Sequence, residues 1–314
     1  MSGRTLALEP VACCLCGSTA AEPVAVGEDF EYRTSDATFL AVRGPRSSLV
    51  SLDPRPTEDE LAVIYPDDYH AFEFSEERYG LVHKVRSRLE AWRVLRAAKG
   101  LRPDARVLDV GCGDGFHLAL LAEHGPGSWR LEGIDVDERA VEAARKRGLE
   151  VHHGRIEDAG LPGAGYDLAL LIQTVEHVAD PPGLLRAVHG VLRPGGRLLV
   201  VTDNTGSLDF RLFRSRHWGG YHFPRHWNLF DERSLRRLAE VTGFEVASLS
   251  TMVSPVNWTY SVRNALDDLG APRRVVDGFS LESAPALAVF TAWDGLHRAA
   301  GRGALLRAVL RRPA

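Results

Sequence analysis

Short apolar runs alternate with amphipathic stretches through the middle of the chain. The runs predict five buried strands, at residues 106–110, 130–135, 149–153, 166–172 and 197–202. Apolar residues recur at helical spacing in 117–123, 138–147 and 182–192, and the connections are short. This alternation is typical of an α/β fold, a Rossmann-like, doubly wound parallel sheet.

Two later strands complete a seven-stranded sheet. We predict them at residues 244–253 and 305–311, with the last strand antiparallel at the sheet edge. The intervening stretch of roughly fifty residues is far longer than a usual loop. It includes an apolar helix over 283–297. We therefore interpret residues 254–303 as an insertion that caps a pocket or contacts a second copy in a homodimer.

Residues 1–75 form a separate N-terminal region, followed by a larger domain over 76–314 that opens with an amphipathic helix at 80–99. One apolar face of this helix, which should cover the sheet, consists of Leu81, Val85, Leu89, Trp92 and Leu95. A capping-box pattern predicts a short helix from Thr57 to Tyr65.

Cys13 and Cys16 make one Cys-x-x-Cys knuckle in the N-terminal region. Structural zinc needs four ligands, and no second pair of cysteines follows. The pattern therefore favours a loop with free thiols and no metal. Zinc completed by His70 or by a second subunit is the less favoured alternative.

A glycine-rich turn joins the strand at 106–110 to the helix that follows. Gly111, Gly113 and Gly115 let the backbone approach a ligand, and the helix N-terminus presents free N–H groups. A dinucleotide fingerprint requires a sixth-position glycine, where Phe116 stands, so an NAD-dependent oxidoreductase is disfavoured. Asp135, at the end of the next strand, is placed to accept hydrogen bonds from ribose hydroxyls.

The order acid-x-Gly-x-Gly-x-Gly, led by Asp109, resembles motif I of the class I S-adenosylmethionine (SAM)-dependent methyltransferases. Gln173-Thr-Val-Glu-His177 resembles their motif IV in enzymes that act on small molecules. The resemblance implies SAM as cofactor and S-adenosylhomocysteine as product. Arg155 stands where this class usually has an acid for adenine, so the candidates there are the backbone of Ile156 and a carboxylate from Glu157 or Asp158. The expected cofactor-binding residues are Asp109, Gly111, Cys112, Gly113, Gly115, Asp135, Val136, Ile156 and Gln173.

Aromatic and imidazole side chains crowd residues 203–230, directly after the fifth strand, as expected of a substrate pocket. The segment is similar to one in sugar C-methyltransferases of deoxysugar pathways, where an acid–histidine pair supplies the base. His226 matches the histidine, but Arg225 replaces the acid, so C-methylation of a sugar is not implied. Histidine suits a general base because its pKa lies near working pH. The candidate bases are, in order, His226, His222 and His177, and the candidate substrate contacts are Tyr69, His70, Trp218, Tyr221 and Arg225.

Composition narrows the function further. The net charge of −4 over 314 residues makes no basic field for nucleic acid, and no apolar run approaches the ~20 residues of a membrane span. No signal-peptide pattern and no disulfide framework occur, which indicates the cytoplasm. We expect methyl transfer to O or C of a small, natural-product or sugar-like acceptor. The alternative is a methyltransferase-fold protein that binds SAM and catalyses a cyclisation, or transfers no methyl group.

Overall fold

The computed structural model describes residues 6–66, 69 and 76–314. Its centre is a seven-stranded sheet of order β12-β13-β10-β9-β6-β7-β8. The strands are β6 (Arg106–Val110), β7 (Arg130–Asp135), β8 (Glu150–His153), β9 (Tyr166–Ile172), β10 (Leu192–Asp203), β12 (Glu245–Met252) and β13 (Leu305–Arg311). The five strands from β10 to β8 are parallel, which confirms the predicted Rossmann-like α/β sheet. β13 is antiparallel, as predicted, but it lies between β10 and β12 and not at the edge.

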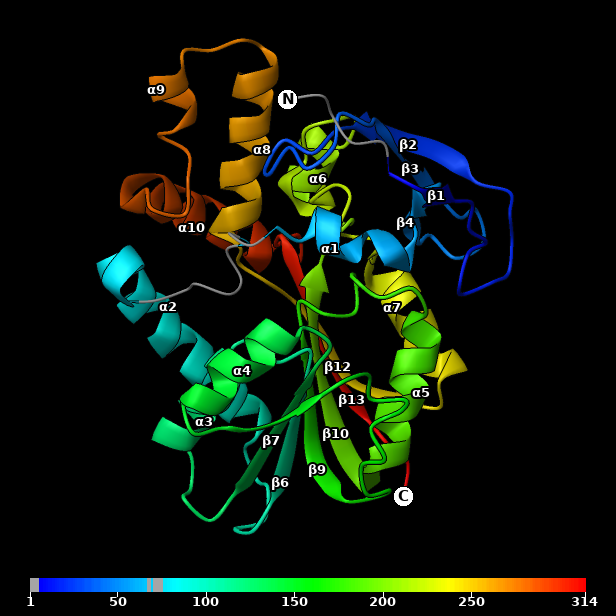
Figure 1. Ribbon diagram of the computed structural model, residues 1–314, viewed down its shortest axis with the longest axis vertical. Coiled ribbons are helices and arrows are strands. Elements are labelled where there is room, and N and C mark those ends of the chain that lie inside the picture. Colours follow the sequence, from blue (N-terminus) through cyan, green and yellow to red (C-terminus); the bar gives the residue numbers. More distant parts are fainter. Residues whose placement is uncertain (1–5, 67–68, 70–75) are drawn as a thin grey trace.

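Helices cover both faces of this sheet (Figure 1). One face carries α2 (Glu76–Ala97), α3 (Phe116–His124) and α4 (Glu138–Lys146), and the other carries α5 (Pro181–Val191) and α7 (Glu232–Val241). Alternate residues of β9 serve the two faces: Leu168 and Leu170 pack with α2 and α3, and Ala169 and Leu171 pack with α5 and α7. A strand buried on both faces is therefore apolar throughout, which is why the sequence marks it so clearly.

The predicted apolar face of α2 is only partly correct, because Leu95 packs with the sheet but its other described members do not. Val85, Leu89 and Trp92 are about half exposed, and the helix packs on the sheet through small residues, including Val94 and Ala97. Small side chains let a helix approach the sheet closely, whereas the larger apolar residues on the other side dominated the periodicity. Within the described part of the chain, none of the helices combines the length and the apolar character that crossing a bilayer requires.

A second, four-stranded sheet of order β11-β4-β3-β2 stands over the carboxyl ends of the parallel strands (Figure 1). It consists of β2 (Glu22–Gly27), β3 (Phe39–Arg43), β4 (Val50–Leu52) and β11 (Asn228–Leu229). A short pair, β1 (Leu8–Glu9) and β5 (Arg55–Pro56), adjoins it. Because β11 comes from the aromatic-rich segment, the N-terminal region and residues 203–230 share one sheet and one core. The domain boundary near residue 75 stays a prediction.

Residues 57–65 form a 3-10 turn, η1 (Glu58–Glu60), followed by the short helix α1 (Leu61–Ile64). The predicted capping box is wrong, since the Thr57 side chain caps no backbone N–H. Glu60 instead accepts a hydrogen bond from the backbone N–H of Ala7, 3.1 Å away. The carboxylate is thus used to tie the N-terminus to this turn.

The cysteine knuckle faces the turn between β3 and β4. Cys13 Sγ lies 3.1 Å from Ser47 Oγ, and the absence of zinc from the knuckle stays a prediction. His70, the other ligand considered, lies outside the described residues.

Three helices fill the stretch between β12 and β13: α8 (Pro255–Asp268), α9 (Arg273–Val276) and α10 (Ala284–Ala299). Asp294 of α10 is fully buried and accepts hydrogen bonds from the backbone of Ser254 and the indole of Trp258, which fixes α8 on α10. α8 also packs against a 3-10 turn, η3 (Gly219–Tyr221). The insertion therefore stands at the same end of the sheet as the N-terminal region (Figure 1).

Candidate methyl-transfer site

The glycine turn lies at the carboxyl ends of β6 and β7, with the end of β9 beside it. Gly111 has a φ of 72°, and a Cβ there would lie 2.4 Å from the Thr174 side chain. Gly113 also has a positive φ, but a Cβ there would meet nothing within 4 Å. Its backbone N–H donates to Asp135 Oδ2 at 2.8 Å. The turn is thus a side-chain-free bend with a carboxylate beside it, open on the side of Gly113.

Asp109 places a buried carboxyl group, incompletely hydrogen-bonded, directly before this turn. The carboxyl is 1% exposed, and its Oδ2 has no hydrogen-bond partner within the described ranges of the chain. Burial, helped by the charge of Asp135, raises the pKa of Asp109 to about 7. A bound cation would return that pKa toward its ordinary value. The site therefore favours a ligand with a positive group, such as an ammonium.

The other predicted cofactor residues lie at the same edge. Ile156 is buried after β8, and Val136, after β7, is 60% exposed. Gln173, at the end of β9, has a φ of 53° and places its amide 3.4 Å from Asp203 of β10. Cys112 points into the sheet, where a Cβ on Gly133 would lie 2.7 Å from its sulfur. Cys112 thus contributes its backbone to the turn, while its side chain packs in the interior.

The three predicted histidines come together in space, although they lie in two segments of the chain. The ring centroids of His177 and His226 are 4.5 Å apart, those of His222 and His226 are 5.0 Å apart, and those of His177 and His222 are 6.4 Å apart. Tyr65 adds its hydroxyl 2.8 Å from His177 Nδ1. We call His177, His222 and His226 the imidazole cluster.

Glu31 supplies an acid that sequence reasoning missed. Its Oε2 lies 2.6 Å from His222 Nδ1, across 191 residues of sequence. Since a carboxylate accepts, Nδ1–H donates to it, which leaves a lone pair on Nε2, 3.3 Å from the Tyr69 hydroxyl. His222 also has a φ of 41°, a strained value for a residue other than glycine and one that recurs at functional sites. Nothing in the local sequence around Glu31 marks it for this pairing.

His226 has a different environment from His222. Its Nδ1 lies 2.8 Å from the carbonyl oxygen of Gly220, so this nitrogen must carry the proton and donate it. Asp203 Oδ2 is 3.4 Å from the same atom. Burial, together with the neighbouring imidazoles, lowers the pKa of His226 well below its ordinary value. The ring is therefore neutral at pH 7, with its lone pair on Nε2.

Glu176 lies beneath the imidazole cluster and is fully buried. Thr202 donates to its Oε2 at 2.9 Å, whereas its Oε1 has no hydrogen bond to any described residue. Burial, with the charge of Asp203, raises the pKa of Glu176 well above its ordinary value. The pair Glu176–Asp203 thus concentrates buried acidic groups next to three imidazoles.

Three predicted substrate contacts are buried: Trp218 and Tyr221 lie in the core, whereas Arg225 lies next to the cluster, with its guanidinium over the Tyr32 ring that neighbours His222. Trp218 and Tyr221 are 1% exposed, donate to Asp209 and to the Arg214 carbonyl, and belong to the core of the N-terminal sheet. Arg225 is fully buried and holds Asp29 through two hydrogen bonds of 3.0 and 3.1 Å. Their expected role as substrate contacts is corrected by this placement, because residues 203–230 lie between two layers and turn these side chains inward. Tyr69 does reach the cluster, and His70 lies outside the described residues.

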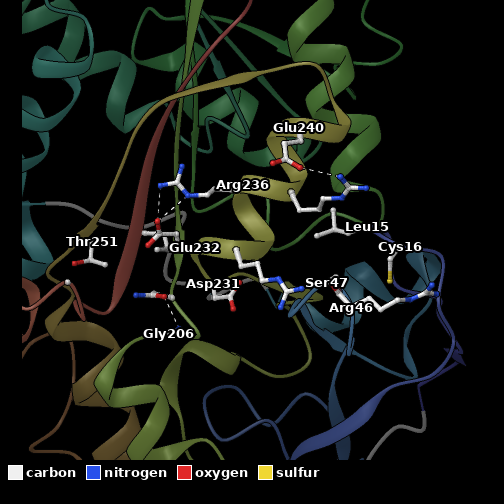
Figure 2. Close-up of a pocket in the computed structure, with 15 residues that line it drawn as sticks. Leu15, Cys16, Arg46, Ser47, Gly206, Asp231, Glu232, Arg236, Glu240 and Thr251 are labelled. Atoms are coloured by element: carbon white, nitrogen blue, oxygen red, sulfur yellow. Dashed lines mark hydrogen bonds and ion pairs between the residues drawn. The ribbon is translucent and has the colours of Figure 1, made fainter.

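A large hollow of about 1080 Å³ opens elsewhere, between the cysteine knuckle and α7. Figure 2 shows Arg236 beside Glu232 on one wall and Cys16 with Arg46 on the other. Two of the four arginines that line it are paired within the hollow, Arg236 with Glu232 at 2.8 Å and Arg237 with Glu240 at 3.2 Å. Neither the glycine turn nor the imidazole cluster lines it, so its size does not make it the site of methyl transfer.

Comparison with known proteins agrees with this geometry. The family model described as a methyltransferase domain matches residues 81–249, more than half of the chain. Similar sequences include an uncharacterised 37.1 kDa protein in transposon TN4556 of Streptomyces fradiae (34% identity, covering 62% of this chain and 58% of the relative). A probable SAM-dependent methyltransferase of Mycolicibacterium smegmatis is 33% identical, covering 45% of this chain and 52% of the relative.

A ubiquinone biosynthesis O-methyltransferase of Leptothrix cholodnii is 28% identical over 44% of this chain and 60% of the relative. The matched part thus spans between half and three fifths of these three relatives. Geranyl diphosphate C-methyltransferase of Streptomyces coelicolor shares the fold, with a TM-score of 0.51, 14% identity, and coverage of 76% of this chain and 81% of that one. The chain belongs to the methyltransferase domain family, with the class I fold that uses SAM as cofactor.

Proposed function

We propose that the protein transfers a methyl group from SAM to an oxygen or carbon atom of a small-molecule acceptor. The hydrogen bond of 2.6 Å between His222 and Glu31 is the observation that carries the proposal. It provides an oriented base at the edge of the sheet where the glycine turn ends. In the sequence, Arg225 stands where the acid of an acid–histidine pair would precede His226. The pair of Glu31 and His222 supplies such a combination from distant segments.

The chemistry needs little more than alignment and one proton acceptor. Methyl transfer from a sulfonium is an in-line displacement, and holding the two atoms about 3–3.5 Å apart removes much of the barrier. A base is needed when the attacking hydroxyl or enol is protonated at neutral pH. Glu31 would hold His222 in one tautomer and stabilise the imidazolium that forms, as a carboxylate does in other base–carboxylate pairs. His226 stays the alternative base.

A small acceptor is supported by the surroundings of the cluster. Tyr65 and Tyr69 lie edge to face, with ring centroids 5.0 Å apart, and give the cluster an aromatic wall. Asn257 of α8 donates to Asp203, so the insertion reaches the cluster and is suited to cap it. One of the similar sequences is named for ubiquinone biosynthesis, and one protein of similar fold is named for geranyl diphosphate. Both compounds are small molecules.

Transfer of label from methyl-labelled SAM tests the function. A panel of phenols, enolisable ketones and sugar nucleotides serves as acceptors, with S-adenosylhomocysteine binding measured by calorimetry. We expect label in at least one acceptor class, and its loss in Glu31→Gln and His222→Ala with product binding intact. Binding of S-adenosylhomocysteine without transfer to any acceptor would instead favour the SAM-binding alternative that methylates nothing.

A further inference from the structure

We propose that Glu176, His177 and His226 bind one divalent transition-metal ion beside the methyl-transfer site. One ligand atom from each of these residues lies within 4.8 Å of the others. Two imidazoles and a carboxylate, with further positions open to substrate or water, are a common ligand set for such ions. The sequence predicted no metal because these three residues come from two segments and have no recognisable metal-ligand spacing.

The carboxylate of Glu176 calls for a cation. It is fully buried, and its Oε1 points to no hydrogen-bond donor among the described residues. Asp203, also buried, adds a second acid beside this group, with its Oδ2 3.4 Å from His226 Nδ1. No arginine or lysine in the described ranges forms an ion pair with either acid, whereas buried acids elsewhere, such as Asp29, have one. Buried charges are normally paired or bind metal, and an orphaned carboxylate oxygen is expensive.

The two imidazoles are held as metal ligands usually are. The Gly220 carbonyl fixes the proton of His226 on Nδ1, which directs the Nε2 lone pair elsewhere. The Tyr65 hydroxyl lies 2.8 Å from Nδ1 of His177 and holds that ring by a hydrogen bond. Such outer hydrogen bonds fix the ring orientation of a metal-bound histidine and select the nitrogen that coordinates. Thr202 does the same for the carboxylate by holding its other oxygen.

The place of this site gives the ion a role, which rests on the proposed function. His177 is partly exposed, so an acceptor can reach the ion, and the His222 ring lies beside both imidazole ligands. An acceptor hydroxyl bound to the ion becomes more acidic. Its proton passes to His222 Nε2, its oxygen lone pair forms the new bond to the methyl carbon, and the C–S bond breaks with its electrons remaining on sulfur. The ion keeps its oxidation state throughout.

Binding of the ion is tested without SAM or acceptor. The full chain, freed of metal with a chelator, is titrated with Co²⁺, whose visible d–d absorption reports its ligands, and with Mn²⁺ by calorimetry. We expect one ion per chain, with affinity at least about tenfold lower in Glu176→Gln and in His226→Ala. Melting curves and S-adenosylhomocysteine binding verify that both variants fold.

A second group of metal-type side chains gives the matched control. Glu132, Glu150 and His152 also lie within 4.8 Å of one another, but Glu132 is already bonded to Arg106 and Tyr166. His152→Ala should leave Co²⁺ binding unchanged. The proposal fails if the wild type binds no Co²⁺, if folded Glu176→Gln and His226→Ala variants bind it as well as the wild type, or if His152→Ala abolishes binding. If the protein transfers label but binds no metal, only the metal-site proposal is overturned. If it binds metal but transfers no label, only the proposed function is overturned.

Discussion

The cofactor edge and the imidazole cluster are built in opposite ways. The cofactor edge takes Asp109 to Gly115 from one continuous strand and turn, and adds Asp135 from the adjacent strand through a backbone hydrogen bond. The cluster brings Glu31, Tyr65 and three histidines together from widely separated segments. A site made by the backbone of one motif should fail when its local conformation is changed. A site made by tertiary contacts should fail when any distant partner is removed, while the cofactor edge continues to bind.

His222→Ala should have the largest effect. Loss of a positioned base lowers turnover by about 10²- to 10⁴-fold, while the affinity for S-adenosylhomocysteine stays unchanged because the cofactor edge does not use this side chain. Turnover of an identified acceptor and calorimetry measure the two quantities. His226→Ala is the comparison: a greater loss there, with Co²⁺ binding retained and His222→Ala nearly active, would return the base to His226.

Arg225→Ala should destabilise the folded protein. Removing one partner of a buried ion pair leaves Asp29 charged and unpaired, at a cost of about 3–5 kcal/mol. Asp29 also accepts from the backbone of Tyr32, so the strand connection that carries Glu31 should loosen. Denaturant unfolding measures the loss. Arg236→Ala, which breaks an exposed pair with Glu232, is the control and should cost less than about 1 kcal/mol.

If the two arginine variants prove equally stable, the pair between Arg225 and Asp29 does not hold the cluster in place. The imidazole cluster would then not depend on distant tertiary contacts, contrary to the difference described above between the cluster and the cofactor edge. A loss of unfolding free energy confined to Arg225→Ala would support this dependence on distant contacts.

Gly111→Ala should impair the cofactor edge and spare the cluster. A left-handed conformation costs an alanine about 1–2 kcal/mol, and its Cβ would meet the Thr174 side chain. We expect S-adenosylhomocysteine affinity to fall by roughly ten- to a hundredfold, a range that combines this strain with the displacement of the turn. Gly127→Ala is the matched control, since a Cβ there meets nothing within 4 Å and its φ is not positive. Unchanged affinity in Gly111→Ala would show that the turn adapts.

The sequence predicted the first region well and the second only in part, for physical reasons. Buried parallel strands and the glycine turn have local signals, so all seven strands and the place of Asp135 followed from periodicity and spacing. Glu31 could not be found, because nothing near it in sequence indicates a partner 191 residues away. Trp218 was misplaced because composition shows that a segment is aromatic but not which layer each ring faces. The sequence offered Arg225 where an acid next to His226 was expected. The acids near the histidines are instead Asp203 of β10 and Glu31 of the loop after β2.

The smallest effect expected is a pH dependence of cofactor binding. The pKa of Asp109 is about 7 in the empty site, so the carboxyl is mostly neutral at pH 6 and mostly ionised at pH 7.5. We expect the ammonium of S-adenosylhomocysteine to bind the ionised form, so affinity should rise about eightfold between these two pH values. The sign is opposite for the stability of the empty protein: the folded state retains a proton that the unfolded chain releases near 3.8, so stability falls as the pH rises from there to about 7. Calorimetry between pH 6 and pH 7.5 should show the affinity for S-adenosylhomocysteine rising with pH in the wild type. Asp109→Asn should bind weakly throughout and show no such slope. A slope that persists in Asp109→Asn would assign the titration to Asp135 or Asp114, the other acids of the edge, whose pKa values are also raised by burial.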